Sequence, residues 1–186
     1  MRAIDVLTRD HQRIKTVIER LQQAVVGFDR GRGTDVGTLQ EIIGLCERWV
    51  ERAHVLKEEQ CLFPLLEARG LGPEITVVSA LLSQHRTGEA FLRELRLAVD
   101  RVGRGEAGAR RDVVIWARDY VELLREHMRI EDQYFYALAD DALTPGDDES
   151  LLEKFARVDR AVGGDEAARR AWDRILPASG GSGDVH

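Results

Sequence analysis

Apolar residues recur every three or four positions along most of the chain, which places them on one face of an α-helix. Glycine-rich stretches interrupt this pattern and end the preceding helices, at residues 31–33, 70–72 and 103–105. The pattern predicts four long helices, over residues 4–28, 36–65, 75–102 and 113–138. Because the connections are short, successive helices should be antiparallel. The sequence therefore predicts an all-α fold, an up-down-up-down antiparallel four-helix bundle.

The predicted bundle occupies residues 1–142 and is followed by a helical appendage over residues 143–178. Two short helices in the appendage, near 151–162 and 166–176, are expected to pack on the bundle. The glycine- and serine-rich end at 179–186 is expected to be a flexible tail.

Two of the predicted apolar faces continue past polar residues toward the ends of their helices. In the second helix the face reaches Leu65, and Pro64 should kink or loosen the last turn. In the fourth helix it runs through Glu131, Tyr134 and Leu138. We expect Tyr134 to pack in the core or, less favoured, to reach a ligand bound near Glu131.

Four of the five histidines fall one per long helix, and each lies on the apolar face: His11, His54, His85 and His127. In an antiparallel bundle their distances from the helix ends place them at one level. Two carboxylates, Glu58 and Glu131, follow a histidine by four residues and so share its helix face.

A histidine and a carboxylate in an apolar layer cost several kcal/mol unless a partner satisfies them. Six donors from four helices exceed what one tetrahedral zinc ion needs. Carboxylates can bridge two ions, and mixed nitrogen and oxygen donors suit iron or manganese. The constellation therefore favours a dinuclear metal centre, with its ions about 3.5 to 4 Å apart.

The ordered set His11, His54-x-x-x-Glu58, His85 and His127-x-x-x-Glu131 resembles the hemerythrin-like, or HHE cation-binding, domain family over roughly residues 1–140. Two short segments also resemble that family: Asp10-His11 and Glu58-Glu59-Gln60-Cys61-Leu62-Phe63-Pro64. The resemblance implies two non-haem iron ions with an oxo or hydroxo bridge. It also implies terminal imidazole ligands at the four histidines and bridging carboxylates at Glu58 and Glu131.

The chain departs from the oxygen-carrying members of that family at two positions. Glu89 stands where they have a second histidine of the third helix, and their bridging aspartate corresponds in spacing to Asp132 rather than Glu131. Glu89 could ligate a metal or orient a ligand histidine. We therefore expect reaction with or binding of dioxygen, peroxide or nitric oxide rather than reversible oxygen carriage. Whether Glu131 or Asp132 reaches the metals is open.

The remaining residues near the motifs have more ordinary expected roles. Glu59 is rotated about 100° from Glu58 and is expected to be solvated. Cys46 and Cys61 lie about 22 Å apart along one helix, too far for a disulfide, and are expected to be buried thiols.

Composition excludes some classes of partner. The formal net charge is -6 with a pI near 5.5, and acidic and basic residues are interleaved, which disfavours nucleic acid and anionic membranes. The first residues lack an apolar signal core and no run is long enough to span a bilayer, so a cytoplasmic protein is expected. The protein partner and oligomeric state are open.

Two functional classes remain for the predicted centre. One is a peroxide- or nitric oxide-consuming di-iron oxidoreductase; the other is a non-catalytic iron-binding or redox- or oxygen-sensing module whose C-terminal helices transmit the state of the site. Ferritin-like sites use Glu-x-x-His, a different order and spacing. A haem with two histidine ligands would leave Glu58 and Glu131 buried without partners.

Overall fold

The computed structural model describes residues 2–31, 34–71, 76–163, 170 and 173–175, and these residues contain helices and no strand. Three segments are π-helices, in which hydrogen bonds join residues five apart. In chain order the elements are α1 (Ala3–Asp29), α2 (Val36–Cys46), η1 (Glu47–Val55), η2 (Glu58–Leu62), α3 (Phe63–Ala68), α4 (Thr76–Gly103), α5 (Ala109–Ile130), η3 (Glu131–Phe135), α6 (Tyr136–Ala142) and α7 (Pro145–Gly163).

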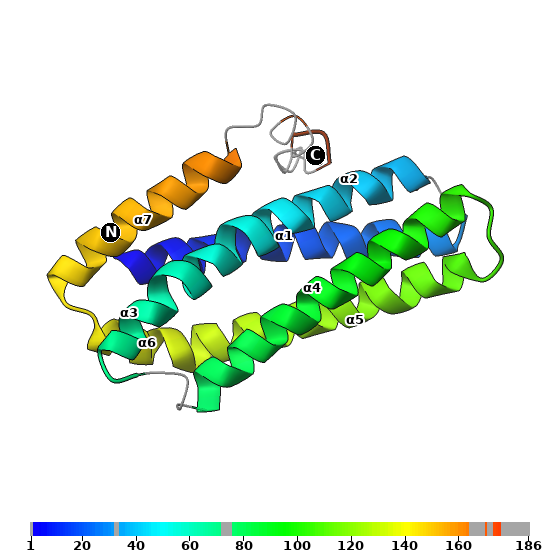
Figure 1. Cartoon of the computed structure of the whole chain (residues 1–186). Helices are drawn as coiled ribbons and strands as arrows, with labels where there is room; N and C mark the ends of the chain where they lie inside the picture. Colours follow the sequence, from blue (N-terminus) through cyan, green and yellow to red (C-terminus); the bar gives the residue numbers. More distant parts are fainter. Residues whose placement is uncertain (1, 32–33, 72–75, 164–169, 171–172, 176–186) are drawn as a thin grey trace, which may run out of the picture.

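The long helices lie side by side as a helical bundle (Figure 1). The segments from α2 to α3 follow one another as one rod, and α5, η3 and α6 form another. Helix α4 packs on α5 and α2, and α1 packs on α5 and α2. The connections that follow α1 and α4 lie at the same end of the molecule (Figure 1). The expected all-helical fold is confirmed.

Helix α7 covers part of the bundle, packing on α1, η1 and η2. It contains the predicted helix at 151–162. Thr144 and Asp147 form its amino-terminal cap: the Thr144 amide donates to Asp147 Oδ2 at 2.9 Å, and the Asp147 amide donates to Thr144 Oγ1 at 3.3 Å. Most of the predicted helix at 166–176 and the tail at 179–186 lie outside the described residues.

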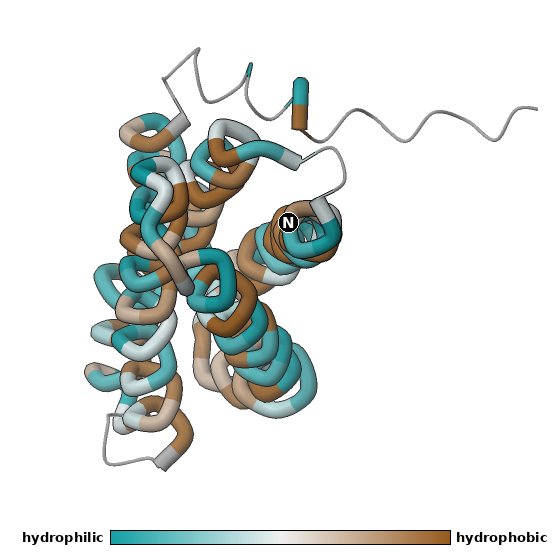
Figure 2. Tube along the Cα trace, turned by 90° about the vertical axis from the view of Figure 1, so that its right-hand side faces the viewer, coloured by the Kyte–Doolittle hydropathy of each residue, from teal (hydrophilic) through white to brown (hydrophobic). Residues whose placement is uncertain are grey.

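The apolar core consists of two clusters. Figure 2 shows hydrophobic residues, in brown, alternating with hydrophilic ones along the helices. One cluster includes Ile14, Val50, Leu92 and Leu124, and the other includes Leu7, Leu62, Leu81 and Phe135. In each rod the residues between these two clusters include the histidines and carboxylates singled out above. The bundle therefore holds a polar layer between two apolar ones.

The π-helices change which residues face the core after this layer. A π-helix needs more residues per turn than an α-helix, so each one shifts the apolar face along the sequence. Tyr134 is 64% exposed and Leu138 40% exposed, whereas Phe135 and Ala139 are buried. The prediction that Tyr134 and Leu138 continue the core face of the fourth helix is therefore wrong.

The same shift occurs in the second rod. Leu66 is fully buried and Leu65 is only partly buried, so the expected face is displaced by one residue after η2. Pro64 lies in the first turn of α3, which continues directly from η2, so Pro64 lacks an amide that would continue the hydrogen-bond ladder of this rod. The helix runs through Pro64 to Ala68, and a kink at Pro64 stays a prediction, whereas the rod already departs from α geometry at Glu47.

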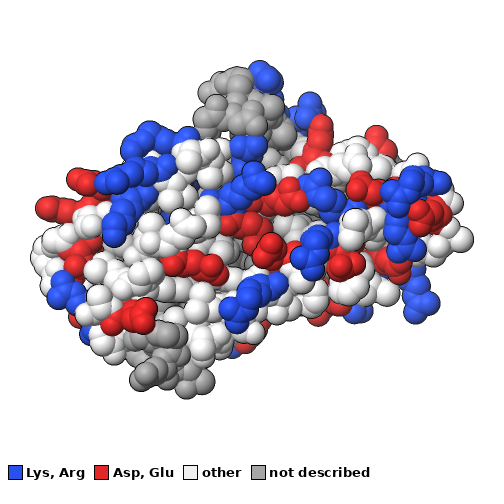
Figure 3. All heavy atoms as spheres, viewed as in Figure 1, with Lys and Arg blue, Asp and Glu red and all other residues white. Residues whose placement is uncertain are grey.

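The distribution of charges on the surface and the state of the two cysteines match what the sequence predicts. Acidic and basic side chains are interleaved over the face shown in Figure 3. No helix in the described ranges is both long and apolar enough to cross a bilayer. Cys46 and Cys61 are buried and form no disulfide.

Candidate metal centre

All six residues singled out from the sequence lie together in the polar layer. His11 comes from α1, His54 from η1, Glu58 from η2, His85 from α4, His127 from α5 and Glu131 from η3. Each is at most 6% exposed. Their donor atoms form two groups, each within 4.8 Å: Glu58, His85, His127 and Glu131 in one, and His11, His54 and Glu131 in the other. The two groups share Glu131.

The imidazoles face each other in pairs through their Nε2 atoms. The His11 and His54 Nε2 atoms are 3.1 Å apart, and so are those of His85 and His127. Glu131 Oε2 lies 3.1 Å from His11 Nε2 and 3.2 Å from His127 Nε2, so its carboxylate touches both pairs. A single carboxylate thus joins the two halves of the layer.

Glu58 makes the second link between the two pairs. Its Oε2 atom lies 3.6 Å from His54 Nε2 and 3.3 Å from His85 Nε2. Its other oxygen accepts a hydrogen bond from the Tyr136 hydroxyl at 2.8 Å. Both carboxylates therefore lie between imidazoles that come from different helices.

The polar layer contains buried carboxylate oxygens that have no hydrogen-bond partner among the described residues. Glu58 Oε2 and both Glu131 oxygens have no hydrogen-bond partner there, and an unpaired buried carboxylate is costly. Cations between the carboxylates and the facing nitrogens would remove that cost. Two donors about 2.1 Å from one ion at right angles are about 3.0 Å apart, close to both measured nitrogen separations. The donor set therefore fits two metal ions.

Hydrogen bonds to the outer ring nitrogens orient three of the four imidazoles. Each Nδ1–H donates to a side-chain oxygen, so Nε2 is the ring nitrogen that faces the layer. The pairs are His11 with Asp132 at 2.6 Å, His85 with Glu59 at 2.8 Å and His127 with Gln84 at 3.0 Å. Asp132 therefore orients His11, while Glu131 faces the layer.

Two expectations about neighbouring glutamates are wrong. Glu59 is not merely solvated, because it accepts the His85 hydrogen bond described above. Glu89 is exposed on α4, and among the described residues it belongs to neither group of donor atoms and orients none of the four histidines. The carboxylate that replaces the carriers' histidine is therefore not part of this layer.

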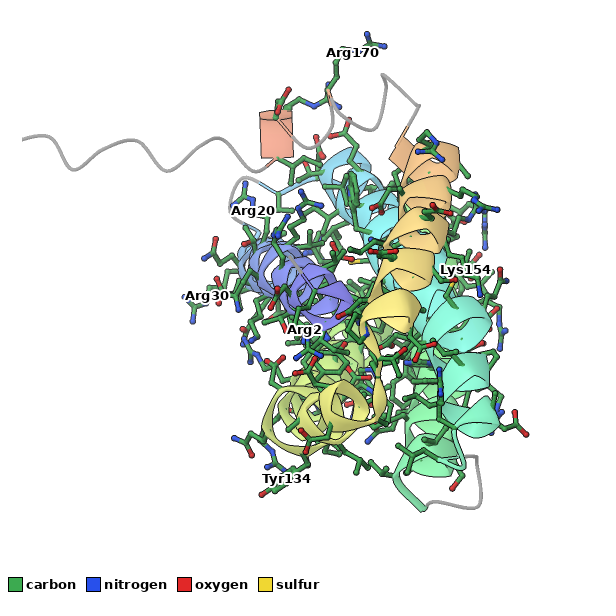
Figure 4. All side chains as sticks on the ribbon, turned by 90° about the vertical axis from the view of Figure 1, so that its left-hand side faces the viewer. Arg2, Arg20, Arg30, Tyr134, Lys154 and Arg170 are labelled. Carbon is green, nitrogen blue, oxygen red and sulfur yellow. The ribbon has the colours of Figure 1, made fainter. Side chains whose placement is uncertain are left out.

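Tyr136, not Tyr134, is the tyrosine of the site. Its hydroxyl donates to Glu58 and lies 3.2 Å from His11 Nε2. Tyr134 points away from the bundle at its edge (Figure 4). In a continuous α-helix Tyr136 would be turned about 140° from Glu131, and η3 brings it back to the same face. No α-helical spacing in the sequence identifies Tyr136.

Ionisation in the layer is strongly perturbed. Burial opposes protonation of His11 and His85, but their carboxylate partners prevail and raise the pKa to about 9 and about 10. Burial lowers the pKa of His54 well below its usual value. Burial would raise the pKa of Glu58, yet the surrounding imidazoles, His54 first, lower it. Glu58 is therefore held as a carboxylate, the form that binds cations.

A buried lysine lies beside the layer. Lys57 is 1% exposed, and its Nζ donates to Asp10 at 2.7 Å and pairs with Asp159 of α7 at 2.6 Å. Lys57 precedes Glu58 and Asp10 precedes His11, so the ion pair ties α7 to residues adjacent to the site. No spacing in the sequence identifies Lys57 and Asp10 as partners.

Comparison with known proteins agrees with this arrangement. The sequence profile of the Hemerythrin HHE cation binding domain matches residues 2–139. The uncharacterized proteins Rv1995 of Mycobacterium tuberculosis and Mb2018 of Mycobacterium bovis are each 21% identical over 169 residues. The matched part covers 91% of this chain and 66% of each relative. The chain thus spans slightly less than two thirds of the relatives that it matches.

Proposed function

Because the chain belongs to the hemerythrin HHE cation-binding domain family, we propose that its polar layer binds two non-haem iron ions and reacts with a small ligand, namely dioxygen, peroxide or nitric oxide. The observation that carries the proposal is the sharing of Glu131 by two buried groups of donor atoms. A carboxylate shared by two groups of donors favours a dinuclear centre over two independent mononuclear sites.

Each residue of the layer has a defined part in this proposal. His11 and His54 would hold one ion and His85 and His127 the other, and Glu58 and Glu131 would supply carboxylate donors between them. Bound iron supplies the redox chemistry. Asp132, Glu59 and Gln84 orient the imidazoles, and the Tyr136 hydroxyl holds Glu58 in place. The apolar clusters on both sides exclude water from the layer.

The donor set supports ligand chemistry over reversible oxygen carriage. Glu89 is exposed and belongs to neither group of donor atoms, so it adds no ligand in place of the carriers' histidine. What remains is the absence of a fifth histidine from the described layer. A centre with four imidazoles has one protein donor fewer than the carriers and keeps more positions for exogenous ligands.

A sensing role is the second candidate, and one contact favours it. The ion pair from Lys57 to Asp159 links α7 to the residue next to Glu58. A change at the centre could therefore alter how α7 packs. Anaerobic iron loading followed by a peroxide consumption assay separates the candidates: sustained turnover indicates an oxidoreductase, and negligible turnover with a shift in α7 protease sensitivity indicates a sensor.

We also infer the directions of the helices, the regions of the chain and the location of the protein. The four long rods are proposed to run up-down-up-down over residues 1–142, with an appendage at 143–178, in a cytoplasmic protein. The shared end of the two connections in Figure 1 supports the alternation of directions.

Substitution of the shared carboxylate tests the dinuclear proposal. Glu131→Ala removes a donor from both groups, so the iron content should fall from two per chain toward one or zero. Glu89→Ala is the matched control, since Glu89 is an exposed glutamate on α4, and it should retain two irons. Elemental analysis of both variants gives the answer, and equal iron content in Glu131→Ala and the wild type would refute the bridge.

A further inference from the structure

A small cavity adjoins the polar layer on the side away from Tyr136. Its volume is about 10 Å³, comparable with the space of one water molecule. Three proposed ligand histidines line it, His54, His85 and His127, together with apolar side chains such as Leu124 and Met128. A diatomic ligand or a peroxide that approaches the ions through this cavity meets mainly apolar walls.

A larger pocket opens at the surface between η1 and α4. Its volume is about 260 Å³, and Glu47, Glu89, Leu92 and Arg96 are among its lining residues. Glu51 also lines it, and among the described residues Glu51 is common to this pocket and the inner cavity. The Glu51 side chain therefore stands between solvent and the cavity beside the histidines.

Gly88 of α4 gives this passage its width. A Cβ atom added at Gly88 would lie 3.5 Å from Leu123 Cδ2, 3.9 Å from Tyr120 Cε2 and 4.0 Å from Glu51 Oε1. The Tyr120 hydroxyl donates to the same Glu51 oxygen at 3.4 Å. Any side chain at position 88 would thus occupy space in the wall of the inner cavity, beside Glu51.

The charges along the passage favour neutral molecules. Acidic and basic groups of the outer pocket are balanced, with three glutamates and three arginines, and Arg96 pairs with Glu47 at 2.6 Å. Burial, together with Glu89 and Glu59 and against the opposing effects of His85 and Tyr120, raises the pKa of Glu51 to about 7. Between Glu51 and the histidines the wall is largely apolar, with Val50, Leu123 and Leu124, so an anion would lose hydration on its way to the layer, whereas a neutral molecule would not.

We propose that small neutral ligands exchange between solvent and the metal centre along this path, with the Glu51 side chain as its barrier and Gly88 providing its width. The proposal rests on the metal centre inferred above and adds the route and the charge class of its ligand. Leu92 and the aliphatic parts of the arginines complete the outer wall.

Nitric oxide binding to the reduced, iron-loaded protein tests the path by stopped-flow spectroscopy. Gly88→Val narrows the passage and should slow both association and dissociation about tenfold, as expected for a barrier raised by about 1.4 kcal/mol. Glu51→Ala widens it and should accelerate both. The affinity should stay unchanged, because residues of a path alter the barrier and not the bound state.

Gly44→Val is the matched control. Gly44 is also within a helix, and an added Cβ there meets nothing within 4 Å, so its binding rates should equal those of the wild type. If Gly88→Val does not fold, Gly88→Ala replaces it, since its methyl group makes only ordinary contacts. It should slow both rates to a smaller extent.

A second readout is independent of iron. In the zinc-loaded protein, exchange of the His54 Nδ1 proton with water, followed by NMR, should be slower in Gly88→Val and faster in Glu51→Ala. Unchanged rates in both variants by both methods, or an effect on one rate constant that alters affinity, would overturn the path. A wild-type protein that binds no iron would instead refute the metal centre itself.

Discussion

The Tyr136 hydroxyl, which belongs to none of the six proposed ligands, donates a 2.8 Å hydrogen bond to Glu58. Burial, and then the charges of Glu131 and Glu58, raise its pKa well above the usual value. The free side chain is therefore a neutral phenol that donates its proton to Glu58. Such outer hydrogen bonds orient ligands and strengthen metal binding.

Tyr136→Phe removes this donor without changing the shape of the side chain. Iron affinity, measured by competition with a chelator, should fall about 10- to 100-fold. Tyr134→Phe is the matched control because Tyr134 is 64% exposed, and it should bind iron as the wild type does. Equal losses in the two variants would show that the Tyr136 hydroxyl has no specific role.

The sequence predicted six residues of the layer because they are polar residues at helical spacing on apolar faces. The rotation of Glu59 by about 100° from Glu58 along the helix predicts a solvated side chain. The glutamate side chain is long enough, however, to reach the outer ring nitrogen of His85 on the neighbouring helix. Lys57 was overlooked because its partners, Asp10 and Asp159, are distant in the sequence. Periodicity within one helix cannot reveal pairs between helices.

Three of the six proposed ligands lie in π-helical segments. His54 lies in η1, and Glu58 and Glu131 begin η2 and η3. π-helical segments are rare and often lie at functional sites. Each one shifts the register of the following turn, so predictions based on a 3.6-residue period succeed up to the site and fail after it. This shift accounts for the exposure of Tyr134 and Leu138 and for the partial burial of Leu65.

Helix α7 is held to the bundle by the buried Lys57. Lys57→Ala removes the buried cation at 2.7 Å from Asp10 and leaves that carboxylate only Arg13 among the described residues, at 3.6 Å, which should lower the free energy of unfolding by about 3 kcal/mol. Urea denaturation measures this change. Lys154→Ala, at an exposed lysine of α7, should change it by less than about 0.5 kcal/mol. A similarly small effect for Lys57→Ala would mean that the ion pair does not stabilise the fold.

The start of α7 should confer a pH dependence. Hydrogen bonds from the Thr144 amide and hydroxyl, and then Arg69, lower the pKa of Asp147 to about 2. A lowered pKa contributes stability at higher pH that is lost as pH falls through the folded value. Asp147→Asn should therefore reduce the melting temperature at about pH 6 and lose most of this difference near about pH 2.

The control for this titration is Glu149→Gln in the same helix, at an exposed position. Its difference from the wild type should be small and nearly constant across the same pH range. If Asp147→Asn behaves in the same way, the cap does not stabilise α7 through its charge. Thermal scans followed by circular dichroism distinguish the two results.

At the scale of the whole molecule, a polar layer interrupts an apolar core, and the fold is arranged so that every long rod contributes to that layer. The two apolar clusters on either side supply the burial that stabilises the bundle. Cations in the layer would add to this stability, since Glu58 Oε2 and both Glu131 oxygens lack hydrogen-bond partners among the described residues. Metal binding and stability should therefore be coupled.

Native mass spectrometry of the wild-type chain loaded with ferrous iron under anaerobic conditions tests the central claim most directly. The account predicts a species heavier than the 21.0 kDa chain by two irons, with a cooperative loss of both on chelation because they share Glu131. A chain that binds no iron, or that binds a single iron at saturation, would contradict it.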